Sequence, residues 1–246
     1  MNSIYKNITA SKAKDEKLLA VLIDPDKMNL NDASRFISKI NQSIATHIFV
    51  GGSEVDEGLT DSLVIEVKKY TNLPVVLFPG DVIQITDKAD GILFLSLISG
   101  RNPDYLIGKQ VEAVSKLAKT NLEIIPTGYL LIENGKETAV QRVSETKPIQ
   151  RKDLQTIKDT AKAGELLGLK LIYLEAGSGA THAIEPHIIS EVKQQLNIPL
   201  IVGGGIRTKT EIEAAYKSGA DIVVIGTAFE DNEAFFDKLK KQQIHN

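Results

Sequence analysis

The sequence predicts an α/β fold of the (β/α)8-barrel type, and three features of the chain support this prediction. Eight short apolar runs alternate with longer amphipathic segments. The runs are rich in Val, Ile and Leu without clean alternation, as expected for parallel strands buried on both faces. The last three runs each end in a glycine-containing turn, which is typical of a phosphate site in such a barrel. An open doubly wound sheet is the alternative, but no G-x-G-x-x-G follows the first run.

The expected strands and helices are spaced as in a single barrel domain that spans residues 1–246. The strands are Leu18–Asp24, His47–Val50, Pro74–Phe78, Gly91–Leu97, Glu123–Gly128, Leu171–Glu175, Leu200–Val202 and Ile222–Gly226. The helices are Leu30–Ile40, Leu59–Tyr70, Tyr105–Lys119, Leu154–Leu167, Pro186–Leu196, Lys209–Ser218 and Asn232–Lys241.

Two connections depart from the regular pattern. Only about ten residues separate the third strand from the fourth, and a parallel crossover normally needs a dozen or more. A full third helix is therefore not expected, and one side of the barrel should be thinly covered. After the fifth strand, Asn134-Gly135 stands between two partly apolar arms, which predicts a β-hairpin with a type I′ turn. A surface loop is the alternative, and either would lie on the catalytic face of a barrel.

Composition excludes several classes of protein. The net charge is 29 − 32 = −3, so nothing indicates a nucleic-acid partner or attachment to anionic lipid. The chain has no cysteine, which excludes disulfides and thiolate ligands and fits a cytoplasmic protein. We expect neither a signal peptide nor a transmembrane segment, because no stretch approaches the ~20 apolar residues that a membrane helix needs.

Three glycine turns at successive strand ends predict one phosphate site. They are Gly177-Ser178-Gly179, Gly203-Gly204-Gly205 and Gly226-Thr227-Ala228. Glycine lets the backbone approach a ligand closely, and successive N–H groups can form a concavity for an anion. Each turn alone is equally well explained as an ordinary strand-to-helix connection. Together, and in this order, they favour phosphate binding.

Polar side chains at the ends of the first two strands predict a magnesium site. Asp24 and Asp26 stand where barrel enzymes keep their active sites, and Pro25 stiffens the turn between them. Mg²⁺ is typically held by one or two carboxylates together with substrate phosphates. Asp24 is the preferred ligand because it ends the strand, and Ser53 is a candidate second ligand. A solvated turn without metal is the alternative.

Glu175 and Tyr173 share one face of the sixth strand, because side chains two positions apart point the same way. A glutamate that points into a barrel mouth is costly unless it binds something polar. It can hydrogen-bond a substrate hydroxyl or accept its proton. An ion pair with a neighbouring strand is the structural alternative. The four histidines have no metal-ligand spacing, and we interpret them as structural or surface residues.

These motifs together resemble the geranylgeranylglyceryl phosphate synthase family, which includes bacterial heptaprenylglyceryl phosphate synthases. The resemblance rests on Leu22–Lys27, Val50–Ser53, Tyr173–Ala180, Val202–Arg207 and Gly226–Ala228, and it runs along nearly the whole chain. It implies Mg²⁺-dependent transfer of a polyprenyl group, with geranylgeranyl diphosphate as the expected donor, to the C3 hydroxyl of sn-glycerol 1-phosphate. It also implies a modified TIM barrel whose third helix is missing or replaced by a short extended segment.

The resemblance assigns roles to individual positions. Asp24 and Ser53 match the magnesium positions, and Glu175 and Tyr173 match the catalytic ones. The glycerol phosphate site is matched by Tyr173, Leu174, Glu175, Ala176, Gly177, Ser178, Gly179, Gly204, Gly205, Gly226 and Thr227. Arg101-Asn102-Pro103 resembles a stretch beside the prenyl groove. The preceding Ser99-Gly100 departs from the family's frequent Asn-Ser, so no role is carried over there.

The resemblance further implies a homo-oligomer, with a hexamer preferred over a dimer, and apolar positions in Tyr105–Leu117 are candidates for its interface. The prenyl tail is expected in an apolar groove where the third helix is absent. Two other functions stay open at this point. A phosphosugar isomerase-type barrel needs an acid/base pair at the first and fifth strands, but Ile125-Pro126-Thr127-Gly128 carries no carboxylate. A non-catalytic barrel that binds a phosphometabolite would not need Asp24, Ser53 and Glu175 together.

Overall fold

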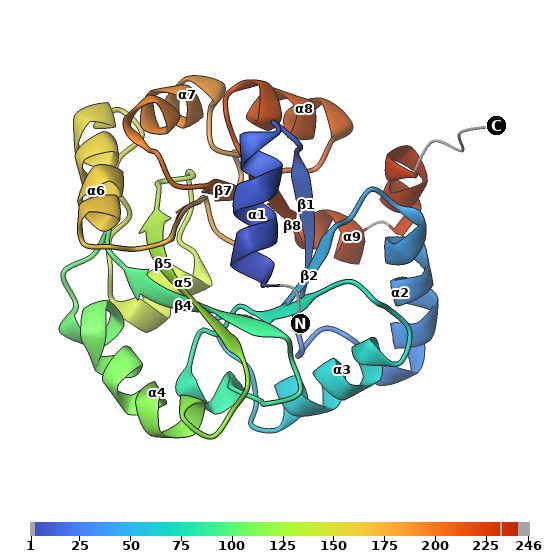
Figure 1. Cartoon of the computed structure of the whole chain (residues 1–246). Coiled ribbons are helices and arrows are strands. Elements are labelled where there is room, and N and C mark those ends of the chain that lie inside the picture. The colour runs from blue at the N-terminus through green and yellow to red at the C-terminus, as the bar shows by residue number, and fades with distance from the viewer. Residues whose placement is uncertain (1–2, 232, 241–246) are drawn as a thin grey trace.

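The eight strands form a closed barrel of parallel strands in the order β1 to β8, in a computed structural model that describes residues 3–231 and 233–240 (Figure 1). They are β1 Leu18–Ile23, β2 His47–Val50, β3 Val75–Leu77, β4 Gly91–Leu97, β5 Glu123–Leu131, β6 Leu171–Glu175, β7 Leu200–Gly203 and β8 Ile222–Ile225. The predicted barrel is confirmed. The largest difference lies in β5, which continues beyond Gly128 to Leu131.

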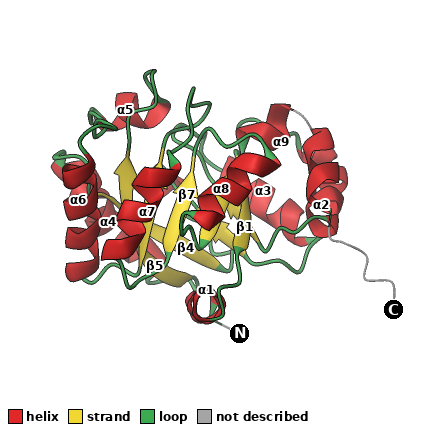
Figure 2. Ribbon diagram, turned by 90° about the horizontal axis from the view of Figure 1, so that it is seen from above, coloured by secondary structure: helices red, strands yellow, loops and turns green. Residues whose placement is uncertain are grey.

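Helices surround this barrel, with further segments across its two ends (Figures 1 and 2). They are α1 Ile4–Ala13, α2 Ala33–Gln42, α3 Leu59–Lys68, α4 Lys109–Leu117, α5 Ala139–Ser144, α6 Leu154–Leu166, α7 Pro186–Gln195, α8 Lys209–Lys217 and α9 Thr227–Asp231. Single turns are η1 Leu30–Asp32, η2 Val82–Gln84 and the π-helical η3 Asp104–Gly108, and a longer 3-10 segment is η4 Glu233–Leu239. The last expected helix is this 3-10 segment; its expected end residues Asn232 and Lys241 lie outside the described residues.

Local chemistry sets several helix starts. Thr208 and Glu211 form a capping box at α8, in which each side chain bonds the other residue's backbone N–H. The Asp153 side chain accepts the N–H of Thr156 at the start of α6, and Pro186 stands in the first turn of α7, where its missing N–H costs nothing. In the part of the chain that the structure describes, no helix combines the length and apolar character needed to cross a membrane.

Helix α1 closes the N-terminal end of the barrel. It lies across that end, while α5 stands at the opposite end (Figure 2). The Glu123 carboxylate at the start of β5 accepts the N–H groups of Ile4 and Tyr5 and thereby anchors the first turn of α1. Ile4 and Ile8 are buried in the cluster that fills the barrel interior. The C-terminal end is therefore the one left for a ligand.

The barrel is weakly closed between β3 and β4. β3 pairs with β4 only at Val76–Gly91 and Leu77–Ile92. On its other side, β4 pairs with β5 at seven positions from Gly91 to Leu97. The third helix was expected to be missing or replaced by a short extended segment, and the connection between β3 and β4 carries only the single turn η2. On the β3 side, residues 93–97 of β4 therefore have no strand partner.

The hairpin predicted after the fifth strand is wrong. The chain leaves β5 at Leu131 and forms the helix α5 within the proposed second arm. Asn134 is buried, and its side-chain amide donates to the carbonyl of Ala176 beside β6. The Thr138 hydroxyl accepts the N–H of Gln141 and caps α5. Asn134 therefore ties the loop to the neighbouring strand end instead of making a two-residue turn.

Candidate active site

The cavity at the C-terminal end of the barrel, here called the mouth, brings together residues from loops that are far apart in the sequence. Among its lining residues are Leu22, Asp24, Lys27, Ser53, Tyr173, Glu175, Ser178, Gly204, Gly205, Arg207, Gly226 and Thr227. Most of the predicted site residues therefore meet in one place. Four predicted residues do not line it, namely Leu174, Ala176, Gly177 and Gly179. Leu174 and Ala176 are fully buried in the core between barrel and helices.

Glu175 and Tyr173 point into the mouth from adjacent inward positions of β6. One carboxylate oxygen of Glu175, Oε1, accepts the N–H of Gly177 at 2.5 Å. A Cβ atom built on Gly203 would stand 2.3 Å from Tyr173 Oη and 3.0 Å from Glu175 Oε2, so both oxygens lie over that glycine. Tyr173 Oη is buried beside the Glu175 carboxylate and makes no hydrogen bond of regular geometry among the described residues. A buried hydroxyl without a partner is costly, and a substrate hydroxyl would satisfy it.

Burial raises the pKa of Glu175 into the range of a base that acts near neutral pH. Desolvation raises the pKa of its carboxyl from 4.5 to about 7, while the Tyr173 hydroxyl and the N–H of Gly177 act in the opposite direction. Burial also raises the pKa of Tyr129 and Tyr173 well above the ordinary value, so both phenols stay protonated. A carboxyl poised near 7 can take up a proton from a substrate and release it again.

The glycine turns form a tight backbone cradle on the β6–β8 side of the mouth. Gly204 and Gly205 have φ angles of 81° and 72°, in the left-handed region that other residues rarely adopt. A Cβ on Gly204 would stand 2.3 Å from Glu175 Oε1 and 2.6 Å from the backbone N of Gly177. Position 204 therefore requires glycine mainly because the Glu175 carboxylate leaves no room for a side chain. This contact could not be inferred from the sequence. Ser178 and Thr227 hydroxyls approach to 3.5 Å and bring the β6 and β8 loops together.

Asp24 and Ser53 line the mouth at the ends of the neighbouring strands β1 and β2. The Asp24 carboxylate accepts the N–H of Asp26 at 3.2 Å and lies 3.4 Å from Lys27 Nζ. It also packs on the β2 turn, since a Cβ on Gly52 would be 2.9 Å from Asp24 Oδ1. Residues 3–231 and 233–240 contain no cluster of three or more His, Cys, Asp or Glu suited to a metal. One carboxylate and a neighbouring hydroxyl fit Mg²⁺ when substrate phosphates complete the coordination.

Gln84 holds the β2 and β3 turns together, a role that no sequence pattern predicts. Its side-chain amide donates to Gly52 O at 2.8 Å, and its oxygen accepts the N–H groups of Gly52 and Gly80. The residue is buried within η2. This short turn therefore supports the Gly52-Ser53 turn beside Asp24.

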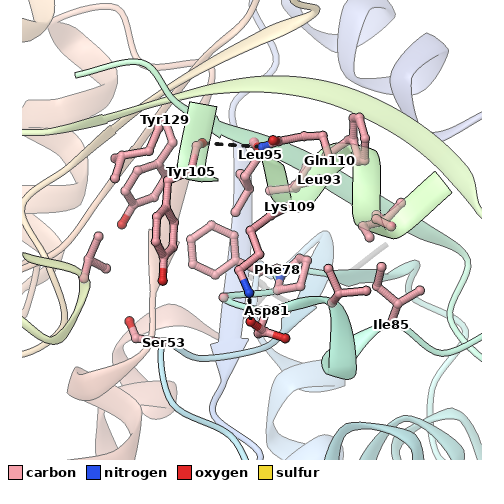
Figure 3. A pocket seen from close by; sticks show the side chains of 18 of the residues that line it. Ser53, Phe78, Asp81, Ile85, Leu93, Leu95, Tyr105, Lys109, Gln110 and Tyr129 are labelled. Atoms are coloured by element: carbon pink, nitrogen blue, oxygen red, sulfur yellow. Dashed lines mark hydrogen bonds and ion pairs between the residues drawn. The ribbon is translucent and has the colours of Figure 1, made fainter. Parts of the chain in front are cut away.

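An apolar pocket, here called the groove, lies where η2 takes the place of a helix (Figure 3). Its apolar lining comes from β3, η2, β4, α4 and α5, and includes Phe78, Val82, Ile85, Ile92, Leu93, Phe94, Leu95, Leu97, Ala113, Val140 and Val143. Lys109 reaches over this lining to Asp81, with Nζ 2.6 Å from Oδ2. Gly52, Ser53, Phe78, Tyr129 and Val140 line both the groove and the mouth, so the two cavities adjoin.

Three aromatic rings stand at this junction. The ring centroids of Phe78, Tyr129 and Tyr173 are 5.4 to 5.9 Å apart. Aromatic ring faces carry partial negative charge and attract cations. The junction between groove and mouth is therefore suited to a positively charged carbon.

The Arg101–Pro103 stretch supports α5 above the groove. Asn102 donates its side-chain amide to Ser144 O at 2.9 Å, and Tyr105 Oη donates to Val143 O at 2.9 Å. Arg101 donates to the carbonyl of Gly100. Of the histidines, His47 is buried, which lowers its pKa to about 4, and His245 lies outside the described residues.

Comparison with known proteins points to one family. A profile described as the PcrB family matches residues 11–243. A protein of Flavobacterium johnsoniae named geranylgeranylglyceryl phosphate synthase is 55% identical over 237 residues, which cover 96% of this chain and 98% of that protein. A protein of the same name from Thermococcus kodakarensis is 44% identical over 220 residues, covering 89% and 86% of the two chains.

A solved structure has the same architecture. It is (S)-3-O-geranylgeranylglyceryl phosphate synthase from Thermoplasma acidophilum in complex with the substrate sn-glycerol-1-phosphate. The match has a TM-score of 0.91 and 33% sequence identity, and it covers 97% of this chain and 96% of the other.

Proposed function

Because this chain belongs to the PcrB family, whose match extends over residues 11–243, we propose that it is a prenyltransferase that joins a polyprenyl diphosphate to sn-glycerol 1-phosphate. The reaction forms an ether bond at the C3 hydroxyl and releases diphosphate. One observation carries the proposal. A buried carboxylate, a backbone glycine cradle and an apolar groove meet at one barrel mouth, as a phosphorylated alcohol and a prenyl donor require.

Glycerol phosphate occupies the β6–β8 side of the mouth. Its phosphate lies on the Gly204-Gly205 and Gly226-Thr227 turns, where backbone N–H groups serve anions well. Its hydroxyls face Glu175 Oε2 and Tyr173 Oη, which lie together over Gly203. Glu175 orients the C3 hydroxyl and accepts its proton as the new C–O bond forms.

The prenyl diphosphate lies on the opposite side, with its tail in the groove and its diphosphate near Asp24 and Ser53. The allylic C–O bond breaks, and its electron pair leaves with the diphosphate. When bound, Mg²⁺ neutralises charge on that leaving group, and Asp24 and Ser53 are the residues that would hold it. The rings of Phe78, Tyr129 and Tyr173 face the carbon on which positive charge develops.

A product assay tests the proposal. Purified protein is incubated with labelled sn-glycerol 1-phosphate, Mg²⁺ and prenyl diphosphates of several lengths, with geranylgeranyl diphosphate as the expected donor. An acid-stable labelled ether lipid is the expected product. A phosphosugar isomerase or a non-catalytic phosphometabolite-binding barrel would form none with any donor.

An exposed apolar face on η3 and α4 supports a homo-oligomer, and a hexamer is preferred over a dimer. Ile107, Val111 and Val114 are 61%, 65% and 57% exposed and recur at helical spacing, so they form one apolar stripe. Burial against a second copy would remove this stripe from water. Light scattering at micromolar concentration measures the assembly, and a monomeric mass would contradict it.

The cytoplasm is the proposed location, because a chain without cysteine fits a reducing compartment.

A further inference from the structure

Arg151 joins two loops at the side of the mouth, although it does not line the mouth itself. Its guanidinium Nη1 donates to Ala183 O at 2.9 Å, Nη2 donates to His182 O at 2.8 Å, and Nε donates to Glu133 O. The side chain is only 14% exposed, and carboxylates of Glu133 and Glu185 lie within 4 Å. One planar cation therefore connects the loop after β5 to the loop after β6.

The segment that Arg151 holds is the wall behind the phosphate cradle. A Cβ built on Gly205 would stand 2.9 Å from the backbone N of Ala183 and 3.0 Å from the carbonyl carbon of His182. Gly205 thus lies directly against the backbone of these two residues. The contacts form a continuous path from Arg151 through His182-Ala183 to a turn that binds the phosphate in the proposed function.

We propose that Arg151 is a positioning residue for glycerol phosphate: it fixes the His182–Ala183 backbone against Gly205 and so sets the geometry of the phosphate cradle. The inference rests on the proposed function. The role requires arginine, because its rigid fork donates to three carbonyls in fixed directions, whereas a lysine ammonium is a single point of charge. Loss of the fork allows the wall to shift, and backbone N–H groups bind an anion well only when they are correctly placed.

The test separates positioning from ordinary stabilisation. Arg151→Met and Arg151→Lys are compared with Lys193→Met by thermal melting and by separate titrations with sn-glycerol 1-phosphate and with geranylgeranyl diphosphate. Lys193 is a matched control, since its Nζ lies 2.5 Å from the buried Asp221 at the N-terminal start of β8, at the other end of the barrel. Loss of this ion pair should destabilise the fold and leave the geometry of the mouth unchanged.

Arg151→Met should weaken glycerol phosphate binding by about tenfold, the scale seen when a supporting contact behind a binding site is removed. Binding of geranylgeranyl diphosphate should be unchanged. Arg151→Lys should recover melting temperature but not glycerol phosphate affinity. Lys193→Met should lower the melting temperature with both affinities intact.

Two results would overturn the inference, and they are distinguishable. If the wild-type protein binds glycerol phosphate and both Arg151 variants bind it equally well, Arg151 is only a structural residue. If Arg151→Lys restores affinity together with stability, charge alone is sufficient and the fork has no positioning role. A wild-type protein that binds no glycerol phosphate would instead overturn the proposed function, and this inference with it.

Discussion

The mouth and the groove are built in different ways. On the β6–β8 side of the mouth the cradle consists of backbone, with the left-handed Gly204 packed against Glu175 and the Ala176–Gly177 backbone at distances that leave no room for a Cβ. The groove consists mainly of apolar side chains from β4, the turn η2 and the helices α4 and α5. The cradle offers directed N–H groups, and the groove offers mostly apolar surface.

This difference predicts different responses to substitution. Hydrogen bonds weaken steeply when distance or angle changes, so a change in the cradle should affect binding sharply and selectively. Burial of apolar surface is non-directional and proportional to area, so the groove should respond gradually with side-chain volume. Asp24 lines the mouth at the end of β1, where we propose that Mg²⁺ and the diphosphate bind. The following variants test this comparison, from the largest expected effect to the smallest.

Asp24→Asn should reduce turnover by about a thousandfold while the fold stays intact. The variant removes the charge that would hold Mg²⁺ but keeps the side-chain oxygen that accepts the N–H of Asp26. Lewis-acid stabilisation of a leaving group is worth several kcal/mol, and ~1.4 kcal/mol is a factor of ten in rate. Steady-state prenyl transfer and thermal melting measure the two properties. Asp26→Asn, at an exposed neighbour, is the matched control, and a larger loss there would assign the metal to Asp26.

Glu175→Gln should reduce turnover by roughly a hundredfold to a thousandfold, the usual contribution of a general base. Wild-type activity should also fall as the pH drops below about 7, because desolvation raises the pKa of this carboxyl to that value and only the carboxylate accepts a proton. A pH–rate profile of the wild-type enzyme, with Glu175→Gln measured in parallel, checks both. A profile that stays flat from pH 5 to 8 would remove Glu175 from the proton transfer.

The same substitution should stabilise the fold at high pH. Because the folded-state pKa is raised from 4.5 to about 7, the stabilisation from the neutral carboxyl is complete below 4.5 and is lost as the pH rises through about 7. At pH 8 the buried charge then costs about 3 kcal/mol. Glu175→Gln should therefore melt above the wild type at pH 8 and close to it at pH 4. Equal melting temperatures at both values would contradict the raised pKa.

Gly226→Ala should weaken glycerol phosphate binding by roughly tenfold and leave prenyl diphosphate binding unchanged, since misplacement of a bound group by an ångström is costly. A Cβ at Gly226 meets only ordinary contacts, 3.5 Å from Leu22, so the fold accommodates it. Gly204→Val is a less selective variant, because its side chain would first displace Glu175 and reduce turnover as well. Separate titrations of the two substrates decide, and equal losses for both would mean that the two sites overlap.

Ala113→Phe should shorten the groove and change donor preference by several-fold to about tenfold towards shorter prenyl diphosphates, the range that a small change of volume in an apolar pocket produces. Ala113 is buried on the groove side of α4. Competition between geranylgeranyl and farnesyl diphosphate measures the preference, while glycerol phosphate affinity should stay constant. Ser115→Phe, on the exposed face of the same helix, controls for added bulk. An unchanged preference in Ala113→Phe would place the prenyl tail elsewhere.

Sequence patterns by themselves determined the barrel, its strand positions and most residues of the mouth. Runs of Val, Ile and Leu encode buried parallel strands locally, and glycine at a strand end is a local requirement of the turn. The short connection after β3 also follows from residue count alone. Motif matching assigned Leu174 and Ala176 to the substrate site, although alternation along β6 turns both away from Tyr173 and Glu175.

Only the tertiary structure decided what surrounds these residues. The residue pair Asn134-Gly135 favours a hairpin turn locally. The Asn134 side chain instead donates a hydrogen bond to the carbonyl of Ala176, 42 residues away, and the segment forms the loop that leads into α5. Gln84 and Arg151 have no sequence signal, because their partners lie 31 positions away or more in most of their hydrogen bonds. The groove likewise exists because β3 stops pairing with β4. Local propensity determines which segments form strands and helices. The hydrogen-bond partner of a buried polar side chain depends instead on which backbone groups the tertiary fold places next to it.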